Sequence, residues 1–328
     1  MFGDIFAFFQ PIWDKLLAFL NTMPAALSQG LIWGVMAIGL YITYRLLELS
    51  DLTVDGSFCT GGAVCVMMLL AGFHPVVAMM GAMLAGMLTG LVTGFLHTTL
   101  KIPAILAGIL TQLGLWSINL TIMGQANQGV NARSQNLLIS MLYIGQVEKG
   151  TKPFYMHPIF VVAAVTVIMI FILYWFFGTE LGSSIRATGA NSNMARAQGI
   201  NTNAKKMIGL MLSNGLVALA GAMLSQYQGF ADINMGRGAI VIGLASVIIG
   251  EVVFGRLFKN FGLKLMCVSL GAVIYYVIIQ GVITLAEIDT DYMKLISAAI
   301  VAVFLAIPNL RGQVFGGRFK KKKEAGHA

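Results

Sequence analysis

Long apolar runs separated by short polar segments dominate the chain. A membrane-spanning helix needs about 20 mostly apolar residues, and nine runs approach that length. In chain order they are Leu27–Tyr44, Gly56–Gly72, Pro75–Leu96, Ile102–Met123, Pro158–Phe177, Met207–Gln226, Gly238–Phe254, Gly262–Val282 and Met293–Ile307. The pattern predicts an all-α integral membrane protein with about nine transmembrane segments. The second and seventh runs are short and broken by glycine, which favours discontinuous helices there.

The first 24 residues differ from the runs that follow. Aromatic residues alternate there with Asp4, Asp14 and Lys15, and Pro11 interrupts them. These charges are too many for a span, so we expect residues 1–24 to form an amphipathic helix in the membrane interface. The acidic residues also argue against a cleaved signal peptide, which begins with a basic region.

Polar segments mark out the rest of the transmembrane region, residues 25–310. Residues 124–157 form one long loop, with a short helix expected at Leu137–Ile144, and residues 178–206 form another. The first loop is read equally well as a plain connector or as a landing surface for a partner. Residues 311–328 form a basic tail.

Composition agrees with a membrane protein: 58% of the residues are hydrophobic and 10% are charged, whereas soluble domains carry about 25% charged residues. The three cysteines lie in apolar runs without paired spacing, and the four histidines are isolated. No phosphate-binding loop, metal-ligand set or nucleophile arrangement is present. We therefore expect no catalytic residues, no metal and no cofactor in this chain.

The net charge of +8 reports topology rather than a nucleic-acid partner. When the spans alternate in direction, fifteen Lys and Arg residues fall on one side of the membrane and six on the other. The positive-inside rule then places residues 178–206 and the C-terminus in the cytoplasm and the N-terminus outside. The basic tail is expected to contact anionic lipid.

Residues 178–206 are polar yet contain signals for helices. Two short helices are expected, at Ser183–Thr188 and Ser192–Gln198. Gly189 and Gly199 stand where left-handed residues end helices, and Asn191, Ser192 or Asn193 would cap the second helix. Because a bare tether needs no capped helices, the loop is interpreted as a docking element for another protein.

Two segments place acids near the ends of apolar runs in a similar order, Ser50–Ser57 and Ala231–Gly238. The first would face the cytoplasm and the second the outside, which predicts an inverted-topology repeat with broken helices along the solute path. The candidate path residues are Asp51, Thr53, Asp55, Ser57, Asn214, Asp232 and Asn234. The aspartates are equally typical of helix caps, so both roles remain open.

Gly86, Gly90 and Gly94 recur every four residues in the third run and line one face of a helix with glycine. Such a face allows another backbone to approach closely. We expect these residues to serve helix packing rather than chemistry.

The long polar loop resembles the cytoplasmic coupling loop of ABC importer permeases of the branched-chain amino acid and ribose type. The residues that carry the resemblance are Gly182, Arg186, Ala187, Gly189, Asn191, Ala195, Arg196, Gly199 and Ile200. The order of the remaining elements also agrees from about Leu27 to Ile307. Asp51–Ser57 departs from the branched-chain pattern and is similar to permeases that work with tryptophan- or tyrosine-type binding proteins.

The resemblance implies a permease homodimer in the bacterial plasma membrane, two cytoplasmic ATPase subunits that use ATP and Mg, and an extracytoplasmic solute-binding protein. The helices in residues 183–198 would fit a groove on the ATPase. The expected solute is an amino acid, with an aromatic one favoured, and a sugar or nucleoside is the alternative. A secondary transporter or channel that works without an ATPase is the competing class, and it would need ion coupling at Asp51, Asp55 and Asp232.

Overall fold

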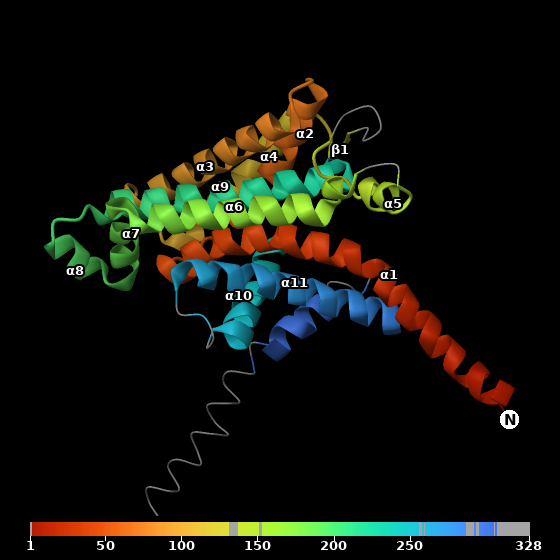
Figure 1. Cartoon of the computed structure of the whole chain (residues 1–328). Helices are drawn as coiled ribbons and strands as arrows, with labels where there is room; N and C mark the ends of the chain where they lie inside the picture. Colours follow the sequence, from red (N-terminus) through yellow and green to blue (C-terminus); the bar gives the residue numbers. More distant parts are fainter. Residues whose placement is uncertain are drawn as a thin grey trace, which may run out of the picture.

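The computed structural model describes residues 2–304 apart from gaps at 131–136, 151–152, 256–257, 259, 287–291 and 293–294, and also residue 306. Within these residues the chain is a helical bundle with small elements at its two ends (Figure 1). The long helices are α1 (Phe2–Tyr41), α2 (Val54–Leu70), α3 (Pro75–Thr98), α4 (Ala104–Met123), α6 (Pro158–Gly178), α9 (Thr202–Gln228), α10 (Ala239–Phe254) and α11 (Phe261–Ala286).

The remaining elements are short. They are the π-helix η1 (Ile42–Leu46), β1 (Asn127–Gly129), α5 (Leu142–Glu148), the 3-10 helix η2 (Phe154–Met156), α7 (Glu180–Ala190), α8 (Ser192–Ala197) and β2 (Phe230–Asp232). In Figure 1, α7 and α8 lie at one end of the bundle, and β1 and α5 lie at the other. The basic tail, residues 311–328, is outside the described residues.

Six described helices are long and apolar enough to cross a membrane, and each contains most of a run expected to span it, although the first begins at Trp13, well before the expected start at Leu27. They are α1 from Trp13 onward together with η1, then α3, α4, α6, α9 and α11 up to Thr284. Three shorter apolar helices occupy the second, seventh and ninth runs, at Val54–Leu70, Ala239–Phe254 and Leu295–Phe304. The helical membrane fold is confirmed. The second and seventh runs are short as expected, but each is one unbroken α-helix rather than a discontinuous one, because the glycines inside each helix have helical backbone conformations and lie against neighbouring elements.

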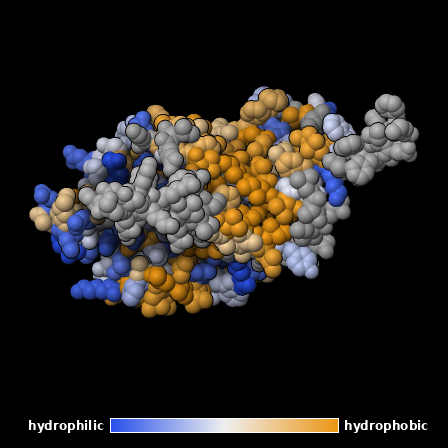
Figure 2. Space-filling model, turned by 90° about the horizontal axis from the view of Figure 1, so that it is seen from below, coloured by the Kyte–Doolittle hydropathy of each residue, from blue (hydrophilic) through white to orange (hydrophobic). Residues whose placement is uncertain are grey.

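The outer surface suits a lipid bilayer. Hydrophobic residues form a broad belt in Figure 2, and hydrophilic residues gather toward one end of the molecule. Helix α6 illustrates the belt, because Val167, Phe171 and Trp175 are each more than 60% exposed while Leu173 is buried. Large apolar side chains exposed together along a helix are stable only against lipid or another protein.

Helix α9 is the centre of the packing and contacts α1, α2, α3 and α7. The glycines of α3 face it. A Cβ on Gly86 would lie 2.4 Å from the Asn214 carbonyl oxygen, and a Cβ on Gly90 would lie 2.3 Å from that of Leu210. Gly94 meets Met207 in the same way. The glycine stripe therefore lets the two helix backbones approach closely.

Contacts between the two halves of the bundle are reciprocal. Helix α9 packs against α3, and α1 packs against α11. Glycines lie at the corresponding positions: Gly215 of α9 meets Met87 of α3, and Gly30 of α1 meets Val273 of α11. If α1 to α4 are taken as one half and α9 to α11 as the other, the first helix of each half packs against the third helix of the other half. This arrangement is expected of an inverted repeat.

Helix α1 differs from the expected arrangement of a separate interfacial helix followed by a span from Leu27. The structure has one continuous helix from Phe2 to Tyr41, through Pro11 and Pro24. Thr22 does not act as a cap before Pro24, because its hydroxyl donates to the Phe19 carbonyl inside the helix. No boundary therefore falls at residue 24, and a location in the membrane interface stays a prediction.

The expected helix at Leu137–Ile144 is displaced, because α5 begins at Leu142. The residues before it pack against the end of α9 instead. Leu137 and Ile139 are buried, the Leu138 N–H donates to Gln226 Oε1, and the Met141 N–H donates to the Tyr227 carbonyl. These bonds to α9 hold the segment out of a helix.

The two strands join this loop to the second of the similar segments. β1 and β2 are antiparallel, and Asn127 is paired with Asp232. The sheet thereby fixes the start of the Ala231–Gly238 segment at the end of the bundle opposite α7.

Candidate functional site

The two segments of similar sequence share a local structure. Asp51 Oδ1 accepts a hydrogen bond from the Thr53 N–H at 2.9 Å, and Asp232 Oδ1 accepts one from the Asn234 N–H at 2.7 Å. Each is an Asx turn, in which a short acidic side chain satisfies the backbone two residues later. The similarity seen in the sequence therefore extends to the hydrogen bonds that precede α2 and α10.

The two segments also meet each other. Asp55, in the first turn of α2, accepts hydrogen bonds from the N–H groups of Gly238 and Ile240, both at 3.0 Å. Gly236 approaches so closely that a Cβ would lie 2.0 Å from the Asp55 carbonyl oxygen. Asp55 thus caps the N-terminus of α10, the helix of the other half, and the N-termini of the two short helices lie side by side.

A buried polar cluster lies beside this junction, between α2, α3 and α9. Asn214 Nδ2 donates to Asp51 Oδ2 at 2.7 Å, and Asn214 Oδ1 accepts from the Ser57 hydroxyl at 2.6 Å. Ser57 also shares a hydrogen bond with Thr89 at 2.7 Å. All four side chains are at most 5% exposed. The network satisfies these groups, as a buried polar group requires.

A chain of threonines extends the cluster. Thr53 shares a hydrogen bond with Thr93 at 2.7 Å, and Thr93 donates to Thr111 of α4 at 3.0 Å. Sequence reasoning missed Thr89, Thr93 and Thr111. A sequence pattern could have identified two of them. Thr89 and Thr93 are four residues apart, the same spacing as the glycine stripe of α3, which places them together on one side of the helix.

The structure divides the candidate path residues into three places. It brings Asp51, Thr53, Ser57 and Asn214 together in the buried cluster. Asp55 lies at the junction of α2 and α10, and Asp232 and Asn234 lie beside the sheet. All three aspartates accept backbone N–H groups, Asp55 at the N-terminus of α10 and Asp51 and Asp232 in Asx turns, and a contact with solute stays a prediction for each. Of the three, Asp55 and Asp232 remain partly exposed.

The Asn214→Leu variant is expected to lower the thermal stability of the protein by several degrees. It leaves one oxygen of the buried Asp51 carboxylate without its donor, and an unsatisfied buried acceptor costs about 1–3 kcal/mol, more when it is charged. Thermal unfolding followed by size-exclusion chromatography measures the loss. The exposed Asn203→Leu on the same helix is the control, and an equal loss in both would contradict the role of the cluster.

At the opposite, α7–α8 end, the polar loop folds largely as the caps predicted. Asn191 is the N-cap of α8, and its Oδ1 accepts from the N–H groups of Asn193 and Met194 at 3.1 and 3.0 Å. Gly199 follows α8 with φ of +78°, the left-handed conformation that favours glycine. Of the apolar side chains, Ile185 is buried, whereas Met194 is 60% exposed at the outer tip.

Gly189 has a different role from the one expected. It does not end a helix in the left-handed conformation, because α7 continues through it to Ala190. Its place is fixed by packing: a Cβ there would lie 1.6 Å from the Leu46 carbonyl oxygen at the end of η1. Gly182 likewise lies against the backbone of Phe176 and Phe177 in α6. Helix α7 is therefore seated on the ends of η1 and α6.

The π-helix η1, on which α7 is seated, is also bonded to α10. Arg45, next to Leu46 in η1, makes two parallel hydrogen bonds to Glu251 near the end of α10, at 2.9 and 3.1 Å. A bidentate Arg–carboxylate pair fixes the relative orientation of its two partners. One end of α10 is thus held by this ion pair, and the other is capped by Asp55.

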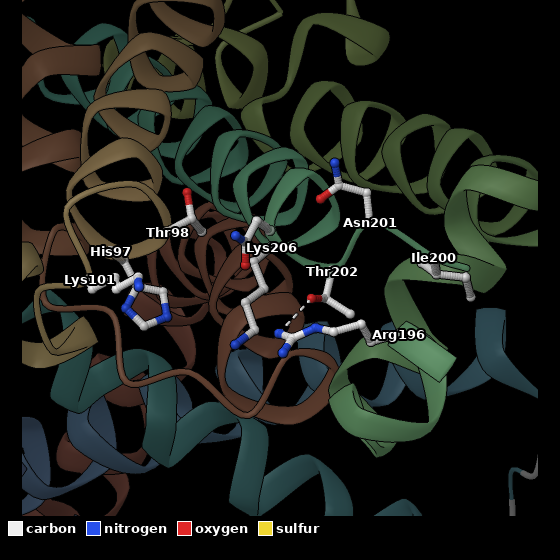
Figure 3. Close-up of a pocket in the computed structure, with 9 residues that line it drawn as sticks. His97, Thr98, Lys101, Arg196, Ile200, Asn201, Thr202 and Lys206 are labelled. Carbon is white, nitrogen blue, oxygen red and sulfur yellow. Dashed lines mark hydrogen bonds between the residues drawn. The ribbon is translucent and has the colours of Figure 1, made fainter. Parts of the chain in front are cut away.

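The two arginines of the loop point to different surroundings. The Arg186 guanidinium lies over the Phe261 ring, 5.6 Å from its centroid, and packs toward α6 and α11. Arg196 donates to the Thr202 hydroxyl at 3.2 Å (Figure 3). Both side chains remain exposed, and Ala195 beside Arg196 is buried.

Arg196 lines a pocket of about 560 Å³ between α8, the start of α9 and the turn after α3. Figure 3 shows that Arg196 and Lys206 approach this space from the loop and α9, and that His97 and Lys101 approach it from the other side. The loop therefore presents an exposed methionine near a pocket lined by Arg196, Lys101 and Lys206. Such a surface suits a protein partner that combines an apolar hollow with acidic side chains.

Comparison with known proteins finds one family model and several relatives that match this chain. Residues 23–306 match the family model described as branched-chain amino acid transport system / permease component. The chain is 38% identical, over 87% of its length and 91% of the relative, to the tyrosine transport system permease protein of Clostridioides difficile strain R20291. It is 32% identical over 88% of its length, and 98% of the relative, to an uncharacterised protein of Rickettsia prowazekii strain Madrid E.

A more distant relative broadens the range of solutes in this group. The autoinducer 2 import system permease protein LsrC of Yersinia pseudotuberculosis strain YPIII is 28% identical over 73% of this chain and 64% of its own length. No solved structure gave a significant match.

Proposed function

Because the chain belongs to the family of branched-chain amino acid transport system permease components, we propose that it is the membrane-spanning subunit of an ATP-binding-cassette importer for an amino acid, with an aromatic amino acid preferred. Its family and its apolar helices make it a multi-pass protein of the bacterial inner membrane. The permease role in an ABC-type transport system follows from the family. The solute and the coupling to ATP are the proposal.

The observation that carries the coupling is the structure of the α7–α8 loop. Its two helices are capped, α7 is seated on η1 and α6, and Met194 is exposed at the tip. A loop that only joined α6 to α9 would not need this seat. We assign Met194 and Arg196 to contact with a cytoplasmic ATPase, which would hydrolyse ATP with Mg as a separate subunit.

An aromatic amino acid is favoured by the tyrosine transport permease that is 38% identical over 87% of this chain. The branched-chain title of the family model does not decide the solute, since LsrC belongs to an autoinducer 2 system. A sugar or nucleoside is the alternative within the importer class. In the proposed assembly, two copies of the permease bind two ATPase subunits, and an external solute-binding protein delivers the amino acid.

Reconstitution tests the class of transporter directly. The permease would be purified with the ATPase and binding protein encoded beside it and placed in lipid vesicles with radiolabelled L-tyrosine outside. The proposal requires uptake that depends on enclosed ATP and on the binding protein. Uptake by the permease alone in an ion gradient would identify a secondary transporter instead.

Met194→Asp and Arg196→Glu are expected to reduce co-purification of the ATPase by at least tenfold. Burying a methionine contributes about 1.5–3 kcal/mol, and a new acid repels an acidic partner surface. The permease itself should remain folded, because both side chains are exposed. Pull-down from detergent measures the effect, with the exposed Ser183→Asp on α7 as control. Normal ATPase binding by both variants would refute the docking role.

A further inference from the structure

A pocket of about 250 Å³ opens where the N-termini of α2 and α10 meet. Its wall includes Gln112, Trp116 and Asn119 of α4, Asp55 of α2, and Arg237, which precedes α10. These α4 residues lie in the middle third and the following turn of a helix that runs from Ala104 to Met123. The pocket therefore extends from the middle of α4 toward the sheet end of the bundle, where Ile233 follows β2.

Asn119 carries an unused acceptor in this wall. Its side chain is fully buried, and its Oδ1 has no hydrogen-bond partner among the described residues, while its Nδ2 donates weakly to the Gly56 carbonyl at 3.4 Å. A buried acceptor without a partner costs about 1–3 kcal/mol. Such a group is retained where a ligand or water supplies the missing donor.

Arg237 adds a charge that lipid would not accept. Its side chain is exposed, and its backbone is held at the depth of Asp55 by the bond from the next residue, Gly238. A lysine or arginine at the centre of a bilayer costs at least about 2.5–3.5 kcal/mol. This face must therefore be turned toward water, a solute or protein rather than hydrocarbon.

The lining residues sort by chemistry into three groups. Asp55 and Asn119 Oδ1 are acceptors, which suit an ammonium group. The Arg237 guanidinium and the Gln112 amide supply donors, which suit a carboxylate. Trp116, 46% exposed, and Leu113, 65% exposed, provide an apolar wall with an aromatic face. These groups together match the three parts of an amino acid with an aromatic side chain.

We propose that this pocket is a contact site for the solute inside the permease, and that it takes a zwitterionic amino acid with an aromatic side chain. Asp55 and Asn119 receive the ammonium group, Arg237 and Gln112 receive the carboxylate, and Trp116 stacks on the ring. The assignment rests on the proposed importer function and adds the residues that select the solute.

Direct binding to the permease–ATPase complex tests the site without transport. Leu113→Cys, which replaces an exposed residue at the rim, would carry an environment-sensitive fluorophore; Cys59, Cys65 and Cys267 are buried. The probes are L-phenylalanine, phenethylamine, which lacks the carboxylate, and 3-phenylpropionate, which lacks the ammonium group. We expect a saturable response to L-phenylalanine that is at least tenfold tighter than the response to either analogue.

Two variants then identify the groups. Arg237→Gln should weaken L-phenylalanine at least tenfold and leave phenethylamine unchanged, because only the carboxylate loses its partner. Asn119→Leu should weaken L-phenylalanine and phenethylamine alike. If Asn119→Leu does not fold, the exposed Arg237→Gln decides the test alone. Equal affinity for all three probes, no saturable response at about 50 mM, or no effect of Arg237→Gln would overturn the assignment.

Transport separates this inference from the proposed function. In vesicles, Arg237→Gln should lower ATP-dependent uptake of the amino acid at least tenfold. If the wild type takes up the amino acid and Arg237→Gln takes it up equally well, the assignment of the pocket is overturned and the proposed importer function is retained. Saturable binding in a complex that shows no ATP-dependent uptake would support the pocket and overturn the proposed importer function.

Discussion

Gly61→Val is expected to abolish the folded protein. Gly61 lies where α2 crosses α9, and a Cβ there would be 1.9 Å from the Ala218 carbonyl oxygen. Gly221 on α9 makes the reverse contact, with a Cβ position 2.0 Å from the Phe58 carbonyl oxygen. No side-chain rotation relieves these overlaps, because the atoms that clash belong to the backbones of two buried helices.

The expected cost of this change exceeds what the protein can absorb. Overpacking a core typically costs about 1–3 kcal/mol when side chains can move, and here two helices must separate. Total stabilities are about 5–15 kcal/mol. Membrane yield and the monodisperse fraction in size-exclusion chromatography measure the result, which should be near zero for Gly61→Val and strongly reduced for Gly221→Ala.

Gly114 provides the matched control on an exposed helix face. No described atom lies within 4 Å of its Cβ position, although it is also inside a helix of the bundle. Gly114→Ala should leave the yield unchanged or raise it, since alanine favours a helix over glycine by about 1 kcal/mol. A normal yield of Gly61→Val would show that α2 and α9 are not packed as described.

Gly189→Val is expected to eliminate ATP-driven uptake while the ATPase still co-purifies. The added side chain would collide with the Leu46 carbonyl oxygen and lift α7 from its seat on η1. Met194, on the outer tip of α8, stays exposed. The partner would thus still bind, but its movement would no longer reach the bundle. Uptake should fall at least 100-fold, measured beside ATP hydrolysis by the same vesicles.

Gly178→Val serves as the control for Gly189→Val. Gly178 ends α6 just before the same loop, and no described atom lies within 4 Å of its Cβ position. Its uptake should remain near that of the wild type. If Gly189→Val instead lost the ATPase from the complex, the seat of α7 and the docking surface would be the same structure.

Much of the fold could be predicted from local patterns in the sequence. The apolar runs locate the helices because each run must satisfy its backbone internally in lipid. The short length of the second and seventh runs agrees with the two short helices, although their glycines do not break them. The spacing of Gly86, Gly90 and Gly94 marked the face that packs on α9. Asn191 was one of three cap candidates, and it could be proposed from the sequence because its effect is confined to the next three residues.

The errors and omissions concern contacts between distant residues. Gly189 has the same local surroundings as a helix-ending glycine, and only its distance from Leu46 shows why glycine is needed. The partners of Asn214 lie in α2, and Thr89 lies in a third helix, so no sequence window contains the cluster. Pro11 and the charges of residues 1–24 suggested a separate helix, yet α1 is continuous from Phe2 to Tyr41. Asn119 and Arg237 acquired meaning only from the pocket that they share.

Helix α10 is attached to neighbouring elements at both of its ends. Its 16 residues span about 24 Å at 1.5 Å per residue. At one end, the Asp55 carboxylate accepts two backbone N–H groups of α10, and this end would act as the pivot of a tilt. At the other end, Glu251 is paired with Arg45 of η1. A tilt of about 5° around the pivot displaces the far end by about 2 Å over such a length. Under the proposed coupling, a small displacement of α7 would reach η1 and Arg45, tilt α10 and change the angles of donors and acceptors at the pocket without breaking the helix.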